Sequence, residues 1–211
     1  MVFAIALAAA GIVAVPPVTL TARASPTIPP KVVQAALDEA AAVWRAFGVT
    51  IVGRIARDVE SSGVGVLAER ESLPVGPTVR VLFDDGPSTM SNDAGTLGWI
   101  EFAADTPLAE IHLSYANALE LLCRAYGVSQ VNQMPIVQWR TFVSRALGRA
   151  LAHEVGHYVL GSRAHTPRGL MKARQKANDL FGPHRMVFDL SPVDRAAVVS
   201  RLIEADRFAH R

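Results

Sequence analysis

The chain has 211 residues, of which 50% are hydrophobic and 19% are charged, a balance that excludes a disordered chain and a coiled coil. With 21 basic and 19 acidic side chains the formal net charge is only +2, and because no cluster of Lys and Arg stands out, we expect no nucleic-acid partner. The single cysteine, Cys123, excludes an intramolecular disulfide framework and a cysteine-rich zinc finger, so any metal site must use His and carboxylate ligands.

The N-terminus carries no charged side chain before Arg23. Its apolar run from Val2 to Val15 is followed by Ala22-Arg23-Ala24, which offers small residues at the two positions that a signal peptidase reads. Pro16 and Pro17 argue against a membrane-spanning helix, and no later segment is long and apolar enough to span a bilayer. We therefore expect residues 1–24 to be an export signal and residues 25–211 to be one exported domain that does not cross the membrane. An uncleaved N-terminal anchor and a wrongly assigned start codon are the alternatives.

The first half of the expected domain reads as one helix followed by strands. Apolar residues recur with helical spacing after Pro29 and Pro30, and Gly48 is the predicted end of that helix. The segment 58–77 contains several Gly, Ser and Pro residues and is expected to be irregular. Four runs rich in strand-forming residues are predicted strands: 49–55, 79–83, 97–102 and 110–115.

The second half is dominated by a long helical pattern that begins near Pro135 and continues to His157, with Gly161 as the predicted stop. Residues 162–190 show no clear periodicity. A capping signature, Ser191-Pro192-Val193-Asp194, then opens a last helix that runs toward Phe208. The order predicts an α+β fold. A mixed β-sheet and the long helix form an N-terminal subdomain (about 25–161), and a small helical C-terminal subdomain follows (about 162–211).

The most informative motif, His153-Glu154-Val155-Gly156-His157, lies at the C-terminal end of the long predicted helix. Two histidines four residues apart lie about one turn along the same helix face, so both imidazoles can reach one ion. Glu154 points to the side, where it can hold a metal-bound water without being a ligand. Two unrelated surface or core imidazoles are the alternative, but the intervening glutamate favours a metal site.

A catalytic zinc ion needs three protein ligands and one open position for water. The nearest downstream candidate is His165, which the chain can bring back to the helix if it reverses at Gly161, because glycine readily adopts a left-handed conformation. A carboxylate from further along the chain is the alternative third ligand, with the candidates Asp179, Asp189 and Glu204.

The string from His153 to His165, followed by Gly169-Leu170-Met171, resembles the metzincin zinc proteases. Their pattern is H-E-x-x-H-x-x-G-x-x-H followed by a Met-turn. The present string is a variant, because Gly161 lies one residue later than the family glycine and His165 lies four rather than three residues beyond it. The resemblance is close over the motif and loose over the preceding order of helices and strands.

The resemblance implies a zinc-dependent endopeptidase with one catalytic Zn²⁺. His153, His157 and His165 would bind the ion, Glu154 would be the general base for the zinc-activated water, and Met171 would form an apolar floor beneath the ion. The run at 97–102 is similar to the family's edge strand, which pairs with a peptide or protein substrate in extended form. A zinc-binding envelope protein without catalytic activity on the same scaffold remains the alternative from a different class.

Overall fold

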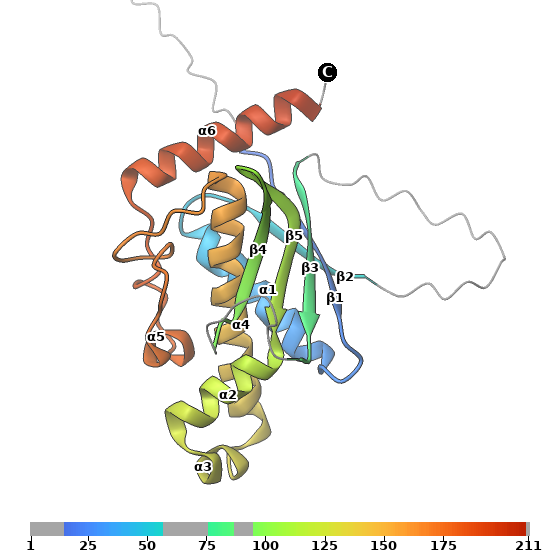
Figure 1. Cartoon of the computed structure of the whole chain (residues 1–211), viewed down its shortest axis with the longest axis vertical. Helices are drawn as coiled ribbons and strands as arrows, with labels where there is room; N and C mark the ends of the chain where they lie inside the picture. The colour runs from blue at the N-terminus through green and yellow to red at the C-terminus, as the bar shows by residue number, and fades with distance from the viewer. Residues whose placement is uncertain (1–14, 57–75, 87–94, 210–211) are drawn as a thin grey trace, which may run out of the picture.

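In the computed structural model, residues 15–56, 76–86 and 95–209 are described. They form five strands and six helices (Figure 1). In chain order these are β1 (Val18–Ala24), α1 (Pro30–Arg45), β2 (Ile51–Ile55), β3 (Thr78–Asp84), β4 (Gly98–Ala103), β5 (Thr106–Ser114), α2 (Tyr115–Tyr126), α3 (Val128–Asn132), α4 (Ile136–Leu160), α5 (Ala177–Phe181) and α6 (Pro192–Ala209). The molecule is thus a mixture of helices and one sheet, which is compatible with the predicted α+β class.

The five strands form one mixed sheet in the order β2-β1-β3-β5-β4. Strands β2, β1, β3 and β5 are parallel to one another. Strand β4 lies antiparallel to β5 at one edge of the sheet. The pairing of β4 with β5 is irregular between Ile100 and Phe102, as at a β-bulge. The sequence run at 97–102 therefore does form an edge strand.

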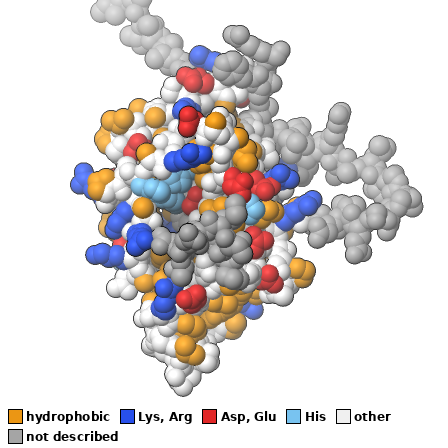
Figure 2. Space-filling view, viewed as in Figure 1, with side chains coloured by type: hydrophobic (Ala, Val, Ile, Leu, Met, Phe, Trp, Pro, Cys, Tyr) orange, Lys and Arg blue, Asp and Glu red, His pale blue; other side chains and the backbone are white. Residues whose placement is uncertain are grey.

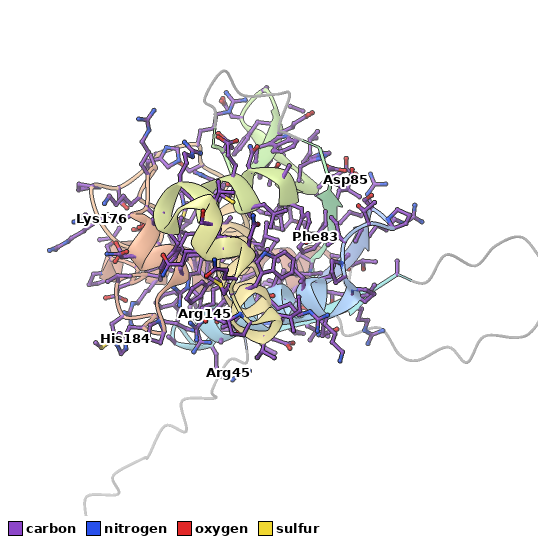
Figure 3. The ribbon with its side chains drawn as sticks, turned by 90° about the horizontal axis from the view of Figure 1, so that it is seen from below. Arg45, Phe83, Asp85, Arg145, Lys176 and His184 are labelled. Carbon is purple, nitrogen blue, oxygen red and sulfur yellow. The ribbon has the colours of Figure 1, made fainter. Side chains whose placement is uncertain are left out.

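Helices α1 and α4 lie side by side against one face of the sheet (Figures 1 and 3). Alternate residues of the strands point toward this helix layer: on β3, Val79, Val81 and Phe83 are buried, whereas Arg80 is exposed. The hydrophobic core lies between the two layers, and the sheet and α1 together hold α4 in place.

Close contact between α1 and α4 depends on a glycine within α4. A Cβ atom at Gly148 would lie 2.6 Å from the backbone oxygen of Ala36 and 2.6 Å from Cβ of Glu39, both on α1. The indole Nε1 of Trp44 donates a hydrogen bond of 3.0 Å to the carbonyl oxygen of Ala152, further along α4. These contacts fix the position of α4 just before the histidine motif.

Several sequence predictions agree with the structure. The long helix ends at Gly161, and the last helix begins at Pro192. Between them, the described chain is irregular except for the short helix α5. The helices α2 and α3 were not predicted. A sequence signal for α2 was present: Ser114 accepts a hydrogen bond from the backbone N–H of Asn117 at 3.1 Å as an N-cap, and the residues after it are good helix formers.

The expected boundary between the export signal and the domain, after residue 24, differs from the structure, where residues 18–24 form strand β1 inside the sheet. It pairs with β2 on one side and β3 on the other, and its residues Val18, Leu20 and Ala22 are fully buried. The folded domain therefore includes residues that we expected to belong to the export signal. Residues 1–14 of that expected signal lie outside the described part. Within that part, no helix is both long and apolar enough to cross a membrane.

We predict that removing β1 prevents folding. A chain that begins at Ser25 would leave β2 and β3 without their shared neighbour and is expected to be insoluble or to lack a cooperative unfolding transition. In the full chain, Leu20→Ala is expected to lower the free energy of unfolding by about 2–5 kcal/mol because it removes a fully buried side chain.

Urea denaturation followed by circular dichroism measures both effects. Arg23→Ala is the matched control, since Arg23 lies on the same strand with an exposed side chain. A cooperatively folded chain that starts at Ser25 would contradict the assignment of β1 to the domain.

Candidate metal centre

Helix α4 carries His153, Glu154 and His157 in its last two turns. The helix ends in a left-handed residue, Gly161, with φ 57° and ψ 38°. The next backbone N–H, of Ser162, donates to the carbonyl oxygen of His157 at 3.3 Å, which closes the helix end and turns the chain back.

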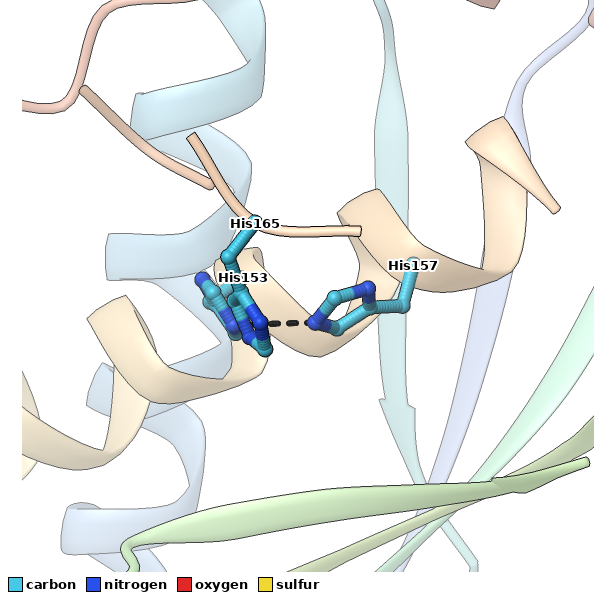
Figure 4. A group of neighbouring side chains, drawn as sticks. All are labelled: His153, His157 and His165. Carbon is cyan, nitrogen blue, oxygen red and sulfur yellow. Dashed lines mark hydrogen bonds between the residues drawn. The ribbon is translucent and has the colours of Figure 1, made fainter. Parts of the chain in front are cut away.

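This reversal brings His165 to the other two histidines (Figure 4). One nitrogen from each of the three rings lies within 4.8 Å of the others. The ring of His165 is stacked on that of His153, with centroids 5.3 Å apart, and lies edge-on to that of His157 at 4.9 Å. The three predicted ligands thus converge on one point, despite the altered spacing of the third.

The hydrogen bonds of the two helical histidines leave their Nε2 atoms as the ring nitrogens available to a metal ion. Nδ1 of His153 lies 2.7 Å from the carbonyl oxygen of Leu170, and Nδ1 of His157 lies 2.6 Å from that of Ser162. A carbonyl oxygen only accepts, so each Nδ1 carries the proton of a neutral imidazole and each Nε2 presents a lone pair.

These two Nε2 atoms are only 3.0 Å apart (Figure 4). Two lone pairs at that separation repel each other unless a cation lies between them. Two nitrogens bound to one tetrahedral zinc ion at about 2.0–2.1 Å would be about 3.3 Å apart. The donor set therefore fits a divalent metal ion.

The local environment keeps the two helical histidines neutral. Burial lowers the pKa of His153 to about 4 and also lowers the pKa of His157, and the neighbouring imidazoles act in the same direction. The rings of His153 and His157 are therefore unprotonated at neutral pH, which is the form that binds metal.

Glu154 lies beside the histidines and is buried, with 7% of its surface exposed. Burial raises the pKa of its carboxyl group to about 8. A cation held by the histidines would favour the carboxylate and lower this pKa again. The Cγ atom of Glu154 faces β4 at Gly98, where an added Cβ would lie 3.2 Å from it. The glycine thus allows the edge strand to approach the glutamate closely.

Met171 is buried beneath the helix that carries the ligands. A Cβ atom at Gly156 would lie 2.3 Å from Sδ of Met171, so the glycine between the two helical histidines makes room for the methionine. The residue before it, Leu170, supplies the carbonyl oxygen that orients His153. Met171 therefore packs against α4 between the two helical histidines, and its role as an apolar floor beneath the ion stays a prediction.

The structure does not bring the alternative third ligands to the histidines. Among the described residues, the one group of three or more potential ligands consists of His153, His157 and His165. The Asp189 carboxylate binds Arg195 instead. Glu204 lies on α6 beside Ser200, and Asp179 lies on α5.

A cleft of about 690 Å³ opens in front of the three histidines. One wall is the edge strand β4 with Gly98, Trp99 and Ile100, and Glu154 also lines the cleft. The histidines form a pale-blue group on this face, with Lys and Arg side chains around it (Figure 2). The volume is in the range of small-molecule and peptide pockets.

A scan of protein-family models and searches of curated proteins and of solved structures found no match to this chain.

Two arginines that the sequence did not single out support the site. Nη2 of Arg163 donates to the carbonyl oxygen of Ala104 at 2.6 Å, and its guanidinium lies over the ring of Phe102 at 4.7 Å. It thereby ties the loop of His165 to the tip of the β4–β5 hairpin. Arg149 lies one helical turn before His153, with Nε 2.9 Å from the carboxylate of Glu39 on α1. Both contacts join residues distant in sequence, so no local pattern could have predicted them.

Proposed function

We propose that this chain is a zinc-dependent endopeptidase with a metzincin-like arrangement of its active site. The observation that carries the proposal is the convergence of three histidines, two of them oriented by backbone carbonyls, beside a buried glutamate in an open cleft. Three neutral imidazoles suit Zn²⁺ and leave a coordination position for water or substrate. The glutamate supports hydrolysis over simple metal storage, because holding the ion does not require it.

In the proposed reaction, the metal ion and the side chains of this protein have separate roles. Zn²⁺ would supply Lewis-acid polarisation of the scissile carbonyl and activation of the attacking water. Glu154 would accept the proton of that water and pass it to the departing amine. Burial of Glu154 against β4 keeps its carboxyl group next to the histidines and away from bulk solvent.

The edge strand is the proposed site for the substrate backbone. In the described sheet, β4 has a strand neighbour on one side only, which is β5. An extended peptide laid along the free side could form main-chain hydrogen bonds and pass in front of the histidines. This mode gives affinity for extended peptides of varied sequence, as expected of an endopeptidase.

We further propose that the protein is exported, on the basis of its charge-free N-terminus. Because β1 begins at Val18 and belongs to the sheet, an export signal would have to be cleaved before that residue rather than after Ala24. The N-terminal sequence of protein recovered outside the cytoplasm of a bacterial host locates the cleavage.

The proposed function is tested on the full chain by metal analysis and peptide cleavage in the same sample. We expect one zinc per chain and cleavage of a mixed peptide library, abolished by a chelator and restored by Zn²⁺. Full zinc occupancy without cleavage of any peptide would contradict the peptidase and favour the non-catalytic zinc-binding protein. Absence of zinc binding would contradict both.

A further inference from the structure

Basic side chains predominate around the cleft. Of the described residues that line it, one is acidic, Glu154, and five are basic: Arg124, Arg149, Arg163, Lys172 and Arg174. The whole chain has a net charge of only +2, so this excess is local. A bound divalent ion with three neutral histidines would add to the positive charge. A cleft lined by one sign of charge concentrates substrates of the opposite sign.

Arg149 is the deepest of these basic groups, with a fully buried side chain. Its Nε donates to Glu39, and its Nη1 donates to the carbonyl oxygens of Asp179 and Leu180 on α5. Its Nη2 has no hydrogen-bond partner among the described residues. A buried N–H without an acceptor is costly, and a carboxylate is the strongest acceptor that a peptide offers.

Glu39 does not neutralise this region. Its second carboxylate oxygen lies 2.5 Å from Arg185, so one acidic group is shared by two guanidinium groups. Two positive charges and one negative charge leave this cluster at +1. Arg149 therefore keeps a net positive charge at the inner wall of the cleft, where low polarity strengthens its effect on a bound anion.

Lys172 provides a second positive group, on the loop that carries the third histidine. Its backbone pairs with that of Thr166, next to His165. Its side chain makes no hydrogen bond or ion pair with a described residue. By contrast, Arg163 is held by the β4–β5 hairpin and Arg124 pairs with Glu120 at 3.6 Å. Arg174 also has an interaction partner. Arg149, whose Nη2 has no partner among the described residues, and Lys172 are thus the basic groups of the cleft with donors left for a ligand.

We propose, on the basis of the peptidase function above, that this cleft selects peptides with a carboxylate close to the cleaved bond. Arg149 and His153 are one helical turn apart, about 5–6 Å between Cβ atoms, and an extended peptide advances about 3.3 Å per residue. The selected carboxylate therefore lies within about two residues of the bond. It belongs to an Asp or Glu side chain, or to the C-terminus of the peptide.

Binding to the zinc-loaded Glu154→Gln variant of the full chain, measured by calorimetry, tests this selectivity without turnover. The probes are N-acetylated peptides of one sequence in three forms: internal Glu with an amidated end, internal Gln with a free C-terminus, and internal Gln with an amidated end. We expect one of the first two to bind about tenfold or more tightly than the third, with the advantage reduced at high salt. Which of the two binds tightly identifies the source of the carboxylate.

Variants of the basic residues show which of them produce the preference for a peptide carboxylate. Arg149→Met is expected to abolish the preference for a carboxylate, and Lys172→Gln to reduce it about threefold. Lys31→Gln, an exposed residue of α1 away from the cleft, should leave it unchanged. If Arg149→Met does not fold, the Lys172 variant and the three peptides decide the question.

The outcomes separate this inference from the proposed function. Equal binding of all three peptides, with zinc-dependent cleavage intact in the wild type, overturns the selectivity alone. Carboxylate-dependent binding with no cleavage of any peptide by the wild type supports the basic site and overturns the peptidase.

Discussion

Replacing Glu154 with glutamine is expected to lower kcat/KM for any cleaved peptide by about 100-fold to 10,000-fold. The variant should still bind one zinc ion per chain. The amide keeps the shape of the side chain but cannot accept the proton of the attacking water, and general-base catalysis contributes factors of this size. The three histidines are unchanged, so the metal should stay. Steady-state kinetics and metal analysis on the same preparation measure the two effects.

Glu204→Gln is the matched control for this experiment, because Glu204 lies on α6 with an exposed side chain and does not line the cleft. It should retain both zinc and activity. If the Glu154 variant lost its zinc, the glutamate would be a ligand, and if it retained full activity, another group would be the base. Either result would contradict the role proposed for Glu154.

Replacing His165 with alanine is expected to weaken zinc binding by more than about 100-fold. Loss of a group that only orients a ligand already costs about 10-fold to 100-fold in metal affinity, and this substitution removes the ligand itself. Its exposed position makes a large loss of folding stability unexpected. Competition with a chelator of known affinity measures the zinc dissociation constant.

His184→Ala is the control for an exposed histidine outside the site. Asp179→Ala, Asp189→Ala and Glu204→Ala test the carboxylates that the sequence left open, and all four variants should bind zinc like the wild type. If His165→Ala bound zinc normally and one carboxylate variant did not, the metzincin-like ligand set would be wrong.

The part of the candidate site that the sequence predicted is the part set by local geometry. Two histidines four residues apart on a helix face the same way in any protein, and a glycine after the last turn is a common helix end. His165 follows Gly161 by only four residues, so the reach of the chain restricts it to the neighbourhood of the helix end.

The errors and omissions have a common physical origin in contacts between distant segments. A parallel strand buried in a sheet reads as a continuous apolar run, and so does the apolar stretch of an export signal, which is why β1 was assigned to the latter. The Arg149–Glu39 pair joins residues on α4 and α1, and no spacing along the chain indicates it. The same holds for the close approach of Gly98 to Glu154.

The irregular pairing of β4 with β5 also affects whether two copies of the molecule can pair through their free sheet edges. A free sheet edge offers its backbone donors and acceptors to any strand, including the same edge of another copy, and such pairing leads to aggregation. The register shift between Ile100 and Phe102 bends this edge, and Glu101 places a charge within the bend. A rigid, folded strand cannot follow the bend, whereas a short flexible peptide can. The same irregularity would therefore allow an unfolded peptide to pair with β4 and prevent a folded copy of the protein from doing so.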